Sequence, residues 1–254
     1  MRIHSIVPAC LLAFTIGIAL VSCSQDNRSQ LVTGPGRSPG ITASSNLVTV
    51  PFDPRNFVRG VDNPYFPLPP GKIYTYKSVS RGGEELNPVE VTRTNKTILG
   101  VAITVVHDQV FIGDGSLAED TFDWYAQDRQ GNVWYFGEDT KQYDHGVLVT
   151  TVGSWEAGKN GAKAGIIMLA HPQIGDIYKQ EDAPGVVADM GKVVSLTETA
   201  SVPYGDFTNC LETTEWTPLE PGDRSHKFYA PGLGNVLEVS TRQGGERVEL
   251  ISVK

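Results

Sequence analysis

The segment TFDWYAQDRQGNVWYFGED, residues 121–139, carries the pattern that decides the fold. Apolar and polar residues alternate on both sides of DRQG, which is typical of two antiparallel strands joined by a tight turn. A type I turn followed by a glycine at positive φ makes a three-residue hairpin with a bulge, and Gly131 fits that position. In the resulting register, Ala126 lies opposite Trp134.

This register separates the hairpin into two faces with different chemistry. One face carries Phe122, Trp124, Trp134 and Phe136, and the other carries Asp123, Tyr125, Gln127 and Tyr135. We expect the Trp/Phe face to be the core, since a fully buried ring of this size contributes about 1.5–3 kcal/mol. A platform on which a ligand stacks is the alternative interpretation of the same face.

The same alternation continues along the chain from about residue 47. Segments such as KIYTYKSVS, AITVVHDQVFI and ERVELISV alternate with period two and are separated by Gly, Pro, Asn and Asp. This spacing predicts a single all-β domain over residues 47–254, folded as an antiparallel curved sheet or half-barrel. The formal net charge of −8 argues against a nucleic-acid partner, because binding to phosphates requires a basic surface.

The N-terminus reads as a targeting segment. Arg2 precedes an apolar run, residues 9–21, which is too short for a stable membrane span. The run ends in LVSC, residues 20–23, which resembles the lipobox of bacterial lipoprotein signal peptides. The resemblance implies that residues 1–22 are removed and that Cys23 becomes the first mature residue, carrying lipid such as palmitate. An ordinary secretory signal with an incidental cysteine is the alternative.

Lipidation at Cys23 places the protein in the cell envelope, with membrane lipid as its partner through an N-terminal acyl anchor. In a Gram-negative cell the resemblance implies the outer membrane, facing the periplasm, because Ser24 follows the cysteine. Residues 23–46 are rich in Ser, Gly and Pro and are expected to form a flexible tether. Cys210 lies in an alternating stretch and is expected to be a small buried residue.

Two short matches at one offset indicate an internal repeat. Gly71 matches Gly175 and Tyr125 matches Tyr229, and both pairs are 104 residues apart (175 − 71 and 229 − 125). We therefore predict two tandem repeats of about six strands each. Repeat one spans about 66–155, a connector spans 156–172, and repeat two spans about 173–254. Convergent hairpin chemistry is the alternative explanation of the matches.

Carboxylates near the hairpin are the candidate catalytic groups. Asp123, Glu138 and Glu156 could supply an acid/base pair, and Glu119 and Asp120 add further negative charge. A cluster of this kind could also bind Ca²⁺. Solvated charges on an edge strand, which discourage aggregation, explain the same residues without a site.

The Gly-rich segment 153–172, which includes the connector, and the polar face of the hairpin hold the candidate ligand-binding residues. These are Trp155, His171, Tyr125 and Tyr135. A Gly-rich connector is typical of a lid or binding loop, although it could equally be only the crossover between the repeats. The histidines show no ligand spacing such as HxH or HExxH, so neither a metal nor a cofactor is expected.

The second half of the chain carries a further resemblance. SVPYGDFTNCLETTEW at residues 201–216, followed by HKFYAPGLGNVLEV at 226–239, resembles half-barrel bacterial lipoproteins akin to the lipoprotein-localisation carriers. That likeness implies a concave sheet that holds an apolar or amphiphilic ligand, and it transfers no functional residue. The expected function is therefore a non-enzymatic binding or carrier domain. A carboxylate-dependent hydrolase acting on a glycan, or a structural surface lipoprotein, are the alternatives.

Overall fold

A computed structural model describes residues 46–80, 83–242 and 245–254. Cys23, the signal segment and nearly all of the tether lie outside the described residues. Within the described ranges the only helix is a 3-10 turn, η1 (Pro54–Asn56), and no helix is long and apolar enough to cross a membrane. The all-β prediction is confirmed. The strands are β1 (Phe57–Val58), β2 (Asp62–Asn63), β3 (Phe66–Pro67), β4 (Ile73–Ser80), β5 (Gly83–Ile98), β6 (Val101–Ile112), β7 (Leu117–Asp128), β8 (Val133–Asp144), β9 (Val147–Thr150), β10 (Trp155–Glu156), β11 (Lys163–Met168), β12 (Ile177–Lys179), β13 (Glu181–Asp182), β14 (Met190–Val202), β15 (Gly205–Trp216), β16 (Ser225–Ala230), β17 (Gly234–Ser240) and β18 (Arg247–Val253).

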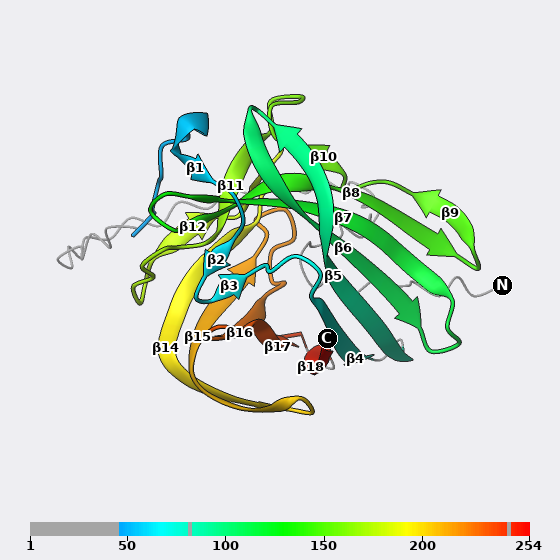
Figure 1. The fold of residues 1–254 in the computed structure, drawn as a ribbon. Helices are drawn as coiled ribbons and strands as arrows, with labels where there is room; N and C mark the ends of the chain where they lie inside the picture. The colour runs from blue at the N-terminus through cyan, green and yellow to red at the C-terminus, as the bar shows by residue number, and fades with distance from the viewer. Residues whose placement is uncertain (1–45, 81–82, 243–244) are drawn as a thin grey trace, which may run out of the picture.

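One antiparallel sheet curls until its two edges meet (Figure 1). The strand order is β12-β14-β15-β16-β17-β18-β4-β5-β6-β7-β8-β11-β13. The first and last strands of this order, β12 and β13, are separated in the chain by Gln180 alone, so residues 177–182 join both edges. Gly165 of β11 packs against this seam, and a Cβ added there would lie 2.2 Å from the carbonyl oxygen of Gln180. The sequence predicted a curved sheet or half-barrel, and the structure shows that the sheet curves further, into a nearly closed barrel.

The connector between the predicted repeats belongs to the wall of this barrel. Its strand β11 pairs with β8 on one side and with β13 on the other. Residues 163–168 are mostly apolar and become buried, because they fill the gap that the two sheet edges would otherwise leave. The connector is thus neither a free loop nor a simple crossover.

Both faces of the β7–β8 hairpin are buried, and the polar face is the one that points into the barrel. Ala126 pairs with Trp134 as predicted, and Tyr125 pairs with Tyr135. The Trp/Phe face is covered from outside by the N-terminal segment: the ring of Phe57 lies 5.7 Å from Trp134, centroid to centroid. Burial is confirmed for Trp124, Trp134 and Phe136, whereas Phe122 is only partly buried. The inward direction of the tyrosine face was not expected from the sequence.

The turn of this hairpin has the predicted geometry. Gly131 has φ +99° and donates its N–H to the carbonyl of Asp128 at 3.0 Å. Asp128 also accepts from the backbone N–H of Asn132 at 2.9 Å and from the indole N–H of Trp134 at 3.0 Å. The carboxylate of Asp128, at the end of β7, therefore holds the turn against the start of β8.

The residues that suggested a repeat occupy similar positions in the two halves, with Gly71 shortly before β4 and Gly175 shortly before β12. Gly71 and Gly175 have φ +92° and +95°, and each donates its N–H to a valine carbonyl, at 2.7 and 2.9 Å. Tyr125 in β7 and Tyr229 in β16 are both buried inside the barrel. Each half is a meander of consecutive antiparallel strands. The tandem repeat itself stays a prediction, because equivalent positions do not by themselves establish a duplication.

Candidate functional site

A small apolar cavity lies inside one end of the barrel. Its volume is about 50 Å³, and its walls come from β3 to β6 and from the β16–β17 turn. It is lined by Phe66, Pro67, Leu68, Tyr74, Tyr76, Val89, Val91, Val106, Leu233, Gly234 and Asn235. Since one water needs roughly 10–15 Å³ by this measure, the space suits a small apolar group or a few waters.

The short β2–β3 hairpin caps this end of the barrel. Phe66 points inward, and its ring lies 5.3 Å from that of Tyr125 and 6.4 Å from that of Tyr229. The cap is held by polar contacts: the Asn63 side chain donates to the carbonyls of Gly131 at 2.9 Å and Leu169 at 3.1 Å. The cap therefore forms one wall of the cavity through Phe66 and Pro67.

Beyond the cavity, the barrel interior is lined with carboxylates. Those on its inner face that are fully or almost fully buried are Asp108, Glu119, Asp123, Glu138, Glu181, Asp189 and Glu215. Among the described residues, Lys227 is the only lysine or arginine with comparable burial, and its Nζ lies 2.8 Å from Glu215 Oε2. Burial raises the pKa of Glu215, but the charge of Lys227 outweighs this and leaves that pKa below its usual value.

Asp123 lies near the middle of this interior. Its Oδ1 accepts a hydrogen bond of 2.6 Å from the hydroxyl of Tyr135, and its cross-strand partner is Glu138. Burial raises the pKa of Asp123 to about 7, against the lowering effect of the Tyr135 bond, and the charge of Glu119 raises it further. Burial, followed by the charges of Glu181 and Asp123, raises the pKa of Glu138 well above its usual value.

Trp155, the residue before the connector, contacts groups of the same interior. Its indole N–H donates to Glu181 Oε2 at 2.8 Å, and its ring meets that of Tyr135 edge-on at 5.6 Å. Burial and the charge of Asp189 raise the pKa of Glu181 well above its usual value. Since several neighbouring acids share this tendency, some of them are protonated near neutral pH.

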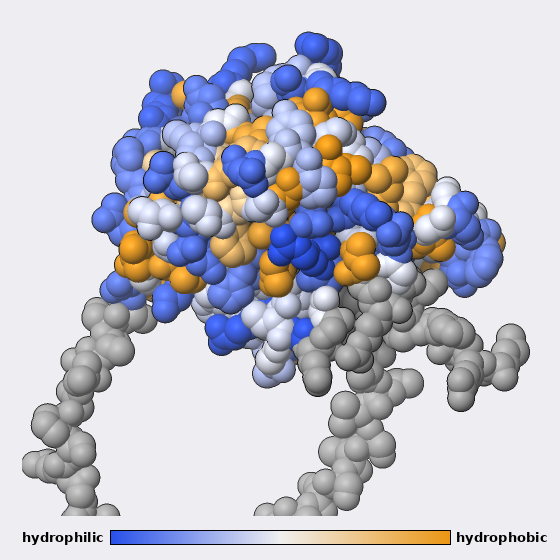
Figure 2. All heavy atoms as spheres, turned by 90° about the horizontal axis from the view of Figure 1, so that it is seen from below, coloured by the Kyte–Doolittle hydropathy of each residue, from blue (hydrophilic) through white to orange (hydrophobic). Residues whose placement is uncertain are grey.

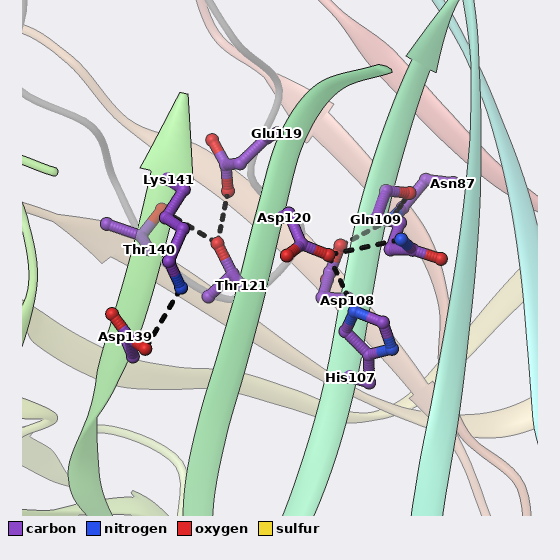
Figure 3. Close-up of polar contacts among 10 residues, drawn as sticks. All are labelled: Asn87, His107, Asp108, Gln109, Glu119, Asp120, Thr121, Asp139, Thr140 and Lys141. Atoms are coloured by element: carbon purple, nitrogen blue, oxygen red, sulfur yellow. Dashed lines mark hydrogen bonds and ion pairs between the residues drawn. The ribbon is translucent and has the colours of Figure 1, made fainter. Parts of the chain in front are cut away.

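Figure 3 shows how strands β5 to β8 separate inner from outer polar groups. On the inner face, the drawn contacts join Asn87 to Asp108, Thr121 to Glu119, and Thr121 to Thr140. On the outer face, they join His107 and Gln109 to Asp120, and Lys141 to Asp139. The outer pairs are partly exposed, with His107 and Asp120 2.7 Å apart. Neighbouring residues of one strand thus belong to different environments.

The structure brings most of the predicted site residues together. Asp123, Glu138, Tyr125, Tyr135 and Trp155 all line or border the barrel interior. The interpretation of the hairpin acids as solvated edge charges is wrong for Asp123 and Glu138, which are 0% and 3% exposed. β7 is a central strand of the sheet, so its inward side chains have no access to solvent.

Two predicted residues lie elsewhere. Glu156 is on the outside of the barrel, where Lys96 and Lys159 each approach its carboxylate to 3.1 Å. His171 is exposed in the segment after β11. The hydrolase alternative therefore has Asp123 and Glu138 as its remaining pair, and a glycan would have to enter the closed barrel to reach them.

Other interior residues were missed from the sequence. Glu181 and Asp189 lie in one short segment, where the N–H of Glu181 donates to the carbonyl of Asp189 at 3.2 Å, while Asp108 in β6 and Lys227 in β16 are far from it in the sequence. The one signal that could have found them is a charged residue on the inward side of an otherwise alternating strand, as in AITVVHDQVFI. Among the described residues, no three or more His, Cys, Asp or Glu side chains are arranged to hold a metal ion.

Comparisons with known proteins give little further information. No family model matches the chain, and no curated protein matches it. One solved structure with a similar fold is that of a "putative lipoprotein" from Parabacteroides distasonis, at 12% identity and a TM-score of 0.42, covering 75% of this chain and 98% of the other. At so low a TM-score the likeness is distant, and nothing about this chain follows from it.

Proposed function

We propose that this protein is a lipid-anchored binding protein of the cell envelope whose barrel holds a small apolar or amphiphilic ligand. The observation that carries the proposal is the apolar cavity of about 50 Å³ inside the barrel, under the Phe66 cap. Ligand sites are typically concave and mostly apolar, with a few polar groups at one side. The envelope location rests on the LVSC motif and the tether that follows it.

Apolar side chains also reach the outer surface of the barrel. Seen from below (Figure 2), hydrophobic residues form several small patches among hydrophilic ones. One exposed apolar group lies in and beside β9 and consists of Val147, Leu148, Val149 and Val152. The lined cavity is the better candidate for specific recognition of an apolar group, because ligand sites are typically concave.

The test is a calorimetric titration of the full chain with 1-hexanol. The chain carries Cys23→Ala, so that no acyl anchor competes for the cavity. Val106→Leu adds one methylene at the cavity wall and is expected to weaken binding, because it occupies space that the ligand needs. Val110→Leu is the matched control, since Val110 is buried on the same face of β6 but does not line the cavity.

Saturable binding that Val106→Leu weakens and Val110→Leu leaves unchanged supports the proposal. Absence of binding, or equal weakening by both variants, overturns it. Melting curves of each variant show whether it is folded.

A further inference from the structure

The apolar cavity and the interior carboxylates adjoin each other. Val106 of β6 lines the cavity and pairs with Asp123 of β7, while Val89 of β5 lines it and pairs with Asp108 of β6. Cross-strand partners present their side chains on the same face, with Cβ atoms about 4.5–5.5 Å apart. Asp108 and Asp123 therefore lie directly beside the inner boundary of the cavity.

Each of these two aspartates uses only one of its oxygens. Asp123 Oδ1 accepts from Tyr135, and Asp108 Oδ1 accepts from the side-chain amide of Asn87. The Oδ2 atoms of both receive no hydrogen bond from the residues that the structure describes, although both side chains are 0% exposed. A buried acceptor without a donor is costly, so the part of the interior beside the cavity is suited to a ligand group that brings donors.

Tyr125 adds a third group of the same kind. Its hydroxyl is buried and has no hydrogen-bond partner among the described residues. Its ring stacks on Tyr135 with centroids 4.9 Å apart and contacts Phe66 under the cap. The negative charges near this hydroxyl include Asp123, Glu181, Glu138 and Asp108. The hydroxyl and the two aspartates therefore share one region of the interior.

We propose that the cavity takes a primary amine, whose apolar body fills the apolar walls and whose ammonium group donates to Asp108 and Asp123. This inference rests on the proposed function and names its ligand class. An ammonium group has three donors and no acceptor, which matches two carboxylate oxygens and one hydroxyl. A carboxylate ligand would bring a like charge, and aromatic rings such as Tyr125 and Tyr135 favour a cation.

The pH dependence of binding follows from the same geometry. Burial raises the pKa of Asp123 to about 7, and burial together with the charge of Asp123 raises that of Asp108. The other charged groups near Asp123 include its cross-strand partner Glu138, together with Glu119, Glu181 and Lys227. An ammonium ion requires the ionised carboxylate, so its affinity should rise with pH. Ionisation of a group with a pKa near 7 increases roughly tenfold between pH 6 and pH 8.

The experiment compares hexylamine, 1-hexanol and hexanoate, which share one apolar chain, on the full chain carrying Cys23→Ala. Calorimetric titrations are run at pH 6 and pH 8. We expect hexylamine to bind at least tenfold more tightly than 1-hexanol at pH 8, with most of that advantage lost at pH 6. Asp123→Asn and Asp108→Asn should each bring the amine-to-alcohol affinity ratio close to one. Asp139→Asn, on the outer face of β8, is the control and should leave the ratio unchanged.

The outcomes separate this inference from the function on which it rests. If 1-hexanol binds and hexylamine binds no better, the amine assignment is overturned while the apolar site stands. Tighter binding of hexanoate than of hexylamine also overturns it. If none of the three binds, the proposed function fails and the amine assignment fails with it.

Discussion

Replacing Asp123 with asparagine should stabilise the protein at alkaline pH. Asparagine has nearly the same shape and can still accept the hydrogen bond from Tyr135, but it removes a carboxyl group from the barrel interior. In the folded chain burial raises the pKa of Asp123 from 3.8 to about 7, so the folded state binds more protons than the unfolded state between these values. Stability therefore falls as pH rises through this window and levels off above pH 7.

The size of the effect can be worked from this pKa. A shift of one unit corresponds to about 1.36 kcal/mol, so a shift of roughly three units sets a ceiling of about 4 kcal/mol. Linkage assigns about 2.6 kcal/mol of this to the interval from pH 5 to pH 8. Relaxation of the interior reduces such values, and we expect about 1–3 kcal/mol, or roughly 2–12 °C in Tm for a domain of this size.

Thermal melts of wild type and Asp123→Asn at pH 5, 6, 7 and 8 test this reasoning. The Tm difference in favour of the variant should grow from pH 5 to pH 7 and level off toward pH 8. Asp139→Asn is the control, because Asp139 forms an exposed pair with Lys141 at 3.0 Å and should contribute less than about 1 kcal/mol without this trend. A difference for Asp123→Asn that stays constant or shrinks as pH rises would refute the assignment of Asp123 as a destabilised buried acid.

Three further outcomes are expected. Gly165→Ala should lower the free energy of unfolding by more than about 3 kcal/mol, because its Cβ would meet backbone across the barrel seam. Gly205→Ala is the control and should change it by less than about 1 kcal/mol, since the nearest atom lies 3.8 Å away. Similar denaturant midpoints for both variants would mean that the seam can open. Gly131→Val should lower the free energy of unfolding, measured by denaturant titration, by about 1–2 kcal/mol more than Gln130→Val, since Gly131 has φ +99°. Mass spectrometry of the protein from native membranes should find diacylation at Cys23, and Cys23→Ala should release the protein from the membrane; an unmodified terminus at another residue contradicts the lipoprotein assignment.

The strands and turns could be predicted from the sequence because their causes are local. Gly131 follows a type I turn and adopts positive φ in the structure, and Ala126 pairs with Trp134 as the bulged register requires. Alternation also showed correctly that Tyr125 and Trp134 belong to opposite faces. Local patterns of this kind depend on residues within one hairpin, so no long-range information was needed.

Which face points into the barrel could not be predicted in the same way. Hydrophobicity favours the Trp/Phe face as core, and it is buried, but by the N-terminal segment around Phe57. Asp123 and Glu138 looked like solvated charges because their partners across the barrel, such as Glu181, come from a distant segment. Closure of the sheet through residues 177–182 decides their environment, and closure leaves no local signature.

The pairing of β18 with β4 has a consequence for how the chain must fold. The N–H of Ile73 donates to the carbonyl of Lys254 at 3.1 Å. One edge of β4, the first long strand of the barrel, is therefore paired only after β18, the last strand, has been added. Contacts of such large sequence separation make folding slow, because the intervening loop has to be closed first. Until β18 is in place, β4 and β17 are both open edges that can pair with other chains. A chain that ends before residue 247 should therefore aggregate, and docking of β18 becomes the step that commits the barrel to close.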